Sequence, residues 1–170
     1  VSTSNSTTGI GDHAFDSGAS LGSITIPDCI TSIGQYAFEN TDLTSITIPK
    51  NVTSIARTAF LYSNRFNSII FEGSAPSFDD DTFYSVCITA YYTCGDPTWT
   101  ADVMQNYGGN ITWEIVHDVN YSESITPPTC TERGYTTHTC TRCGDSYIDS
   151  YVDALGHQWG EWTETTAPTC

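Results

Sequence analysis

The first half of the chain alternates apolar and polar positions in short runs that recur at a fixed spacing. One theme reads Ser-Ile-Thr-Ile-Pro at residues 23–27 and 45–49, and it returns as Ser-Ile-Ile-Phe at residues 68–71. Successive side chains of a strand point to opposite faces. The theme therefore predicts short strands with isoleucine on one face and serine or threonine on the other. Pro27 and Pro49 are expected to end their strands, because proline has no N–H to donate to a ladder.

A second theme, Ile-x-x-x-Ala-Phe, lies between these predicted strands. It spaces Phe15, Phe38 and Phe60 by 23 and 22 residues, and Phe83 stands where a weaker fourth copy would fall. Such a period is typical of a solenoid, whose units cannot bury an apolar face alone but share one core when stacked. We therefore expect ladders of isoleucine and a column of phenylalanine. His13 occupies the slot of Tyr36 and Thr58 in later copies, which favours a surface position over a ligand.

The period and the two themes resemble the BspA-type leucine-rich repeat of bacterial surface proteins. The unit from Leu43 to Phe60 fits that repeat closely, although isoleucine replaces most leucines and there is no asparagine ladder. The resemblance implies a mainly β fold, a right-handed leucine-rich-repeat solenoid over residues 1–78. About three and a half repeats of 22–23 residues would form it.

Residues 79–116 are expected to cap the end of the solenoid, because a terminal repeat otherwise exposes its core. Trp99, Val103 and Tyr107 are spaced as on one face of a short helix over residues 97–108. Residues 111–116 are expected to form a strand.

Residues 117–170 are expected to form a small, β-rich Cys/His module with a longer period. Residues 117–130 align with residues 157–170 at an offset of 40, which indicates one full unit and the start of a second. Both ends of the chain accordingly look like cuts in a longer protein. The pattern Cys…Cys-x-x-Cys-Gly…Ala-Leu-Gly-His resembles a repeat found downstream of leucine-rich regions in surface proteins of gut Firmicutes, and this resemblance implies no activity.

The module contains a candidate structural zinc site. The run Cys-Thr-Arg-Cys-Gly at residues 140–144 resembles a zinc knuckle, and zinc prefers four tetrahedral ligands. The predicted ligands are Cys130, Cys140, Cys143 and His157, with His117 as the alternative fourth ligand. Disulfides and free thiols remain alternatives for these cysteines. A unit with so small a core needs an additional stabilising link, such as a disulfide or a bound metal ion, which we call a staple.

Composition narrows the class of function. The chain has 170 residues, 20 acidic and 5 basic side chains, and a formal charge of −15. This balance argues against nucleic acid and anionic lipid as partners, and no apolar run is long enough for membrane insertion. No motif of a known catalytic site occurs, so we expect no enzyme. The aspartates at residues 79–81 lack the spacing of a calcium loop and are expected to be solvated.

The outward face of the predicted strands is the candidate binding surface. Hydroxyl side chains of successive strands would line up on a rigid surface of the kind by which repeat proteins hold partners. The alternative is that they are only strand formers that tolerate solvent. The candidate residues are Ser23, Thr25, Ser45, Thr47, Ser68 and Ile70.

Together with the resemblance, these features predict a non-catalytic, monomeric fragment of a longer bacterial protein that is secreted or attached to the cell wall. Its expected partner is an extracellular protein or glycan of a host or neighbouring cell, and the expected role is adhesion. The alternatives are an accessory region of a larger surface hydrolase and a purely structural stalk.

Overall fold

The computed structural model describes residues 8–117 and 120–157. The described residues form eleven strands and no helix, and none of them belongs to a helix that could cross a membrane. The chain divides into two compact units, Val1–Val116 and His117–Cys170. Each unit is described by itself below.

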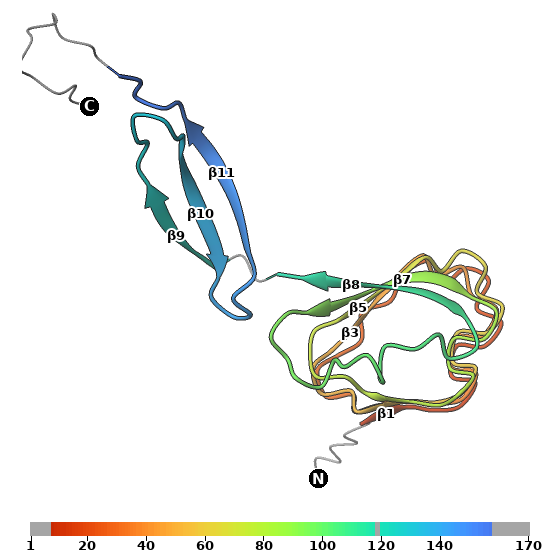
Figure 1. Cartoon of the computed structure of the whole chain (residues 1–170). Coiled ribbons are helices and arrows are strands. Elements are labelled where there is room, and N and C mark those ends of the chain that lie inside the picture. Colours follow the sequence, from red (N-terminus) through yellow and green to blue (C-terminus); the bar gives the residue numbers. More distant parts are fainter. Residues whose placement is uncertain (1–7, 118–119, 158–170) are drawn as a thin grey trace, which may run out of the picture. The chain divides into compact units, whose positions relative to one another are not determined.

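The first unit is a solenoid with two parallel sheets. Figure 1 shows its turns as a stack of similar coils. The larger sheet has the order β3-β5-β7-β8, in which each strand is parallel to its neighbours. Its strands are β3 (Ser45–Ile48), β5 (Ser68–Phe71), β7 (Cys87–Thr93) and β8 (Asn110–Val116).

The smaller sheet has the order β1-β2-β4-β6 and lies where each Ile-x-x-x-Ala-Phe theme begins. The sequence did not predict these strands, because each has only two residues and no alternation to reveal it. Its strands are β1 (Gly9–Ile10), β2 (Ser32–Ile33), β4 (Ser54–Ile55) and β6 (Ser77–Phe78). Their register aligns Ile10 with Ile33 and Ile33 with Ile55, so the expected isoleucine ladder is confirmed.

A column of phenylalanine rings runs through the core. The ring centroids are 5.3 Å apart for Phe15 and Phe38, 5.6 Å for Phe38 and Phe60, and 5.7 Å for Phe60 and Phe83. Adjacent rings are within 6° of parallel. The predicted solenoid is therefore confirmed, and its equivalent turns number about five rather than three and a half.

The additional turns come from residues that were expected to form a cap. β7 and β8 continue the parallel ladder instead of closing it. The helix expected over residues 97–108 is not formed: turns and bends replace it. Trp99 is nevertheless buried, and Val103 and Tyr107 pack against the core. The spacing of these residues therefore identified the buried side chains correctly. The backbone forms only one turn of helical hydrogen bonding, in which Met104 N–H donates to the Thr100 carbonyl.

The first predicted strand is also absent. Ser23 to Ile26 form no strand and do not pair with β3, although Ile26 is buried like the corresponding Ile48. In the described chain β3 is therefore the edge strand of the larger sheet, with β5 as its neighbour. The turn after the proline is still formed, because Ile30 N–H donates to the Pro27 carbonyl at 3.0 Å.

The second unit is an antiparallel sheet with the order β11-β10-β9. Its strands are β9 (Tyr121–Thr126), β10 (Gly134–Cys140) and β11 (Ser146–Val152). Large apolar side chains stay in solvent, with Ile125 76% and Leu155 70% exposed. A sheet with so little apolar burial gains little from the hydrophobic effect, which agrees with the expected need for a staple.

Candidate functional site

The connection from β10 to β11 forms a tight knuckle turn. Gly144 N–H donates to the Cys140 carbonyl at 2.9 Å, and Cys140 N–H donates to the Asp145 carbonyl at 2.7 Å. Gly144 has a φ of +78°, a left-handed conformation that glycine adopts without a steric penalty. The turn carries Cys140 at its start and Cys143 just before the glycine.

His117 completes a group of three donor side chains at this turn. Its Nδ1 lies 3.5 Å from the Cys143 Sγ. The donor atoms of His117, Cys140 and Cys143 all lie within 4.8 Å of one another. A tetrahedral zinc ion with ordinary Zn–S and Zn–N bonds separates a sulfur and a nitrogen ligand by about 3.6 Å. The donor set and its spacing therefore fit a zinc ion.

Asp145 holds the histidine ring in place. Its Oδ2 lies 3.3 Å from the Nε2 of His117. A carboxylate on one ring nitrogen fixes the tautomer that leaves the other nitrogen as a ligand. Because Nε2 faces Asp145, it is Nδ1 that faces the sulfur of Cys143. Asp145 was not among the predicted site residues, although its position directly after the Cys-x-x-Cys-Gly run is a signal for it.

The structure brings together only part of the predicted ligand set. Cys140 and Cys143 lie in the group, and the histidine beside them is His117, the alternative ligand. Cys130 is disulfide-bonded and is not a member of this group. His157 is exposed and is not a member of the group.

The outward residues of the larger sheet form two rows, which we call the outer ladder face. The first row is Ser45, Ser68, Thr89 and Thr112, and the second is Thr47, Ile70, Tyr91 and Glu114. Alternate residues of β3 and β5 are buried, which directs these rows to solvent. Ile70 stands out because 41% of this apolar side chain is exposed.

Half of this face was not predicted. The residues on β7 and β8 were missed because the repeat pattern fades after Phe83. Conversely, Ser23 and Thr25 are exposed but belong to no strand, so they do not extend either row.

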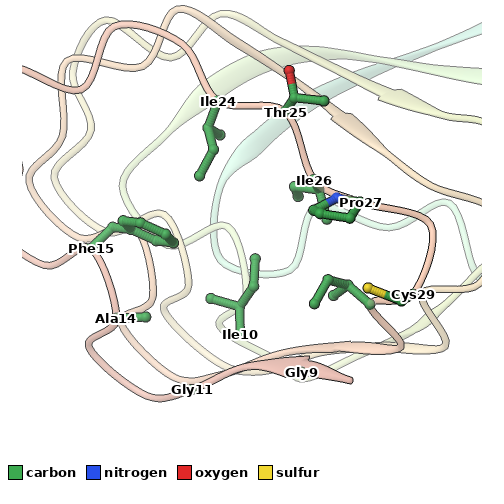
Figure 2. A pocket seen from close by; sticks show the side chains of 11 residues that line it. Gly9, Ile10, Gly11, Ala14, Phe15, Ile24, Thr25, Ile26, Pro27 and Cys29 are labelled. Atoms are coloured by element: carbon green, nitrogen blue, oxygen red, sulfur yellow. The ribbon is translucent and has the colours of Figure 1, made fainter. Parts of the chain in front are cut away.

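An apolar hollow of about 650 Å³ lies at the first turn of the solenoid. Figure 2 shows Ile10, Phe15 and Ile24 pointing toward one another across it. Phe15 is 37% exposed, whereas Phe38 in the next turn is fully buried. The hollow therefore marks the place where the core of the described solenoid ends.

The parallel strands and the period of 22–23 residues define the first unit as a leucine-rich-repeat solenoid. The family described as BspA type leucine rich repeat region matches residues 1–98, with 6 copies. The chain therefore belongs to the BspA-type leucine-rich repeat family. Curated proteins and solved structures give no match. For residues 117–170, the resemblance to a Firmicutes repeat stays a prediction.

Proposed function

We propose that the solenoid is a non-catalytic adhesion module that holds an extracellular protein or glycan on its outer ladder face. BspA-type repeats are typical of bacterial surface proteins and suggest protein–protein interaction. A secreted or wall-attached location in a bacterium is part of the proposal. The observation that carries it is the outer ladder face itself, in which four parallel strands align their outward side chains in register.

The physical basis of the proposed binding is that the outer ladder face is rigid and carries both apolar and polar side chains. Ile70 and Tyr91 are neighbours in the second row, and they are flanked by Thr47 and Glu114. Tyrosine is enriched in binding surfaces because a large ring is buried at a low entropic cost. Every strand of the face is fixed by ladder hydrogen bonds. The backbone therefore loses little conformational entropy when a partner binds.

Charge insertion on the face tests this proposal. Ile70→Asp places a carboxylate at the centre of the second row, and Asn64→Asp adds the same charge at an exposed position outside the sheet. Binding of the purified variants to a panel of extracellular matrix proteins and to whole cells is the measurement. We expect Ile70→Asp to weaken binding by at least about tenfold, as for a central interface residue, and Asn64→Asp to change it little. Equal binding by both variants would favour a structural stalk.

We also propose that Cys140, Cys143 and His117 hold a structural zinc ion. Two thiolates and one imidazole are the ligands that zinc prefers, and Asp145 supplies the supporting carboxylate. The ion would tie the knuckle turn to His117, at the start of the second unit. In a unit with little apolar core, such a tie contributes directly to the free energy of folding.

Metal analysis of protein purified under reducing conditions tests the zinc proposal. After dialysis against a weak chelator, the wild type should retain about one tightly bound zinc ion per chain. Cys143→Ser should lose it, whereas Cys29→Ser, at an exposed cysteine of the first unit, should not. Wild-type protein without bound metal would contradict the proposal. Single substitutions of His157 and the remaining cysteines would identify a fourth ligand.

A further inference from the structure

A second group of donor side chains lies on the first two turns of the solenoid. The donor atoms of His13, Asp16 and Glu39 lie within 4.8 Å of one another. The Nδ1 of His13 is 2.9 Å from the Oδ2 of Asp16. His13 is exposed, as its repeat slot predicted, and the other two residues are half-buried.

The backbone fixes this group in place. Ser17 N–H donates to the Glu39 carbonyl, and His13 N–H donates to the Gln35 carbonyl, both at 2.9 Å. These bonds tie the segment with His13 and Asp16 to the next turn, which carries Glu39. The His13 ring also stacks on Tyr36, with the ring centroids 4.7 Å apart. The three donors are therefore positioned by the fold, although they lie at the surface.

In the described part of the chain, no lysine or arginine ion pair involves this group, whose one basic member is His13. Asp16 and Glu39 occupy the same repeat slot on adjacent turns, so two carboxylates lie close together. The arginine ion pairs of the described solenoid go to Asp42 and Asp81 instead.

We infer that His13, Asp16 and Glu39 bind a divalent transition-metal ion of the zinc type. Zinc accepts imidazole nitrogen together with carboxylate oxygen, whereas magnesium and calcium prefer oxygen alone. The His13 Nδ1 and the Asp16 Oδ2 are joined by a hydrogen bond of 2.9 Å, which the ion would replace, since tetrahedral ligands of this kind stand about 3.4 Å apart. Binding requires a neutral imidazole with its proton on Nε2, so that the Nδ1 lone pair faces the ion.

The ion would act as a clip at the end of the described solenoid. It would join a turn that carries His13 and Asp16 to a turn that carries Glu39. The first of these turns has a described neighbour on one side only, and its Phe15 is partly exposed. The site differs from the thiolate group in its ligands, so the two proposals can fail separately.

Metal titration of the full-length chain under reducing conditions tests this inference. The probes are Zn²⁺, followed by calorimetry, and Co²⁺, followed by absorption, because cobalt bound by thiolate gives intense charge-transfer bands and cobalt bound by nitrogen and oxygen does not. The test variants are His13→Tyr, which inserts the residue of the next repeat, and Glu39→Gln. Asp42→Asn is the matched control, because it removes an exposed carboxylate next to the same turns without touching the group.

We expect the wild type to bind one Zn²⁺ ion more than the thiolate group accounts for, without additional charge-transfer absorption from Co²⁺. His13→Tyr and Glu39→Gln should each weaken this second event by at least about tenfold, since loss of a supporting residue alone costs that much. Asp42→Asn should leave it unchanged. Absence of the second event in the wild type, or its persistence in both test variants with unchanged affinity, would overturn the inference. Circular dichroism of each variant verifies that the solenoid is folded.

Discussion

At the scale of the residue, stability of the solenoid depends most on the stacked phenylalanines. Phe38 and Phe60 are fully buried, whereas Phe15 is 37% exposed. Each inner ring is covered on both faces by the equivalent ring of a neighbouring turn. Removal of an inner ring therefore leaves a cavity that the ladder hydrogen bonds prevent from closing.

We predict that Phe38→Ala lowers the free energy of unfolding by about 3–5 kcal/mol, the usual cost of deleting a buried aromatic ring. Phe15→Ala should cost clearly less, because that ring is already partly in solvent. Urea denaturation of the two variants and the wild type is the measurement. Equal losses in the free energy of unfolding for Phe15→Ala and Phe38→Ala would show that the stacked phenylalanines do not stabilise the core.

A second residue-scale prediction concerns acid stability of the antiparallel sheet. His138 on β10 donates from Nε2 to Asp149 on β11 at 2.8 Å. This hydrogen bond, followed by one from Ser150, lowers the pKa of Asp149 in the folded state. A carboxyl group with a lowered pKa stabilises the fold above its ordinary pKa, and this contribution is lost as the pH falls through the lowered value.

Asp149→Asn should therefore reduce the loss of stability below about pH 4, the ordinary range of an aspartate. The measurement is hydrogen exchange of the β10 amides at a series of pH values. Asp153→Asn is the control, since it removes an exposed carboxylate of the same unit. The same acid dependence in Asp149→Asn and the wild type would show that Asp149 does not stabilise the sheet.

At the scale of the element, the close approach of neighbouring turns limits which side chains fit. A Cβ added to Gly34 would lie 2.6 Å from the backbone nitrogen of Asp12 and 2.7 Å from the carbonyl carbon of Gly11. Both are atoms of the preceding turn. Gly34 N–H also donates to the Ile10 carbonyl at 2.8 Å, so the two turns cannot move apart without losing this bond.

Gly34→Ala should consequently lower the free energy of unfolding by about 1–3 kcal/mol, as overpacking does elsewhere. Gly22→Ala is the matched control, because a Cβ there meets no atom within 4 Å. Thermal denaturation of both variants provides the comparison. If Gly34→Ala proves as stable as Gly22→Ala, the turns are farther apart than described.

The elements also show how far the sequence determined the fold. The two in-phase themes were enough to predict β3, β5 and the phenylalanine column, because alternation and period both depend on burial. The two-residue strands of the smaller sheet carry no such signal. Ser23 to Ile26 repeat the strand motif of β3 and still form no strand, so the motif alone does not determine one.

For the candidate sites, the sequence predicted which types of residue would be ligands better than it predicted which of these residues lie together in the fold. Cys140 and Cys143 were identified by their spacing in one turn. Which histidine joins them depends on how the chain brings His117 back to the turn, which local spacing does not reveal, whereas Asp145 directly follows the Cys-x-x-Cys-Gly run. The group of His13 and Glu39 was missed for the same reason, because its members lie on different turns.

At the scale of the whole molecule, the two units owe their stability to different sources. The solenoid buries a continuous apolar core, whereas the antiparallel sheet leaves residues such as Ile125 in solvent. The formal charge of −15 adds repulsion between like charges in the folded chain. Metal ions at the two donor groups would offset part of this repulsion.

Turns of 22–23 residues stack directly on one another and so create both the core and the outer ladder face. Nuclear Overhauser contacts between the rings of selectively labelled phenylalanines are the decisive test of this stacking. We expect contacts for Phe15 with Phe38, Phe38 with Phe60, and Phe60 with Phe83, at centroid distances of 5.3 to 5.7 Å. A direct contact between Phe15 and Phe60, or no contact between rings of adjacent turns, would contradict it.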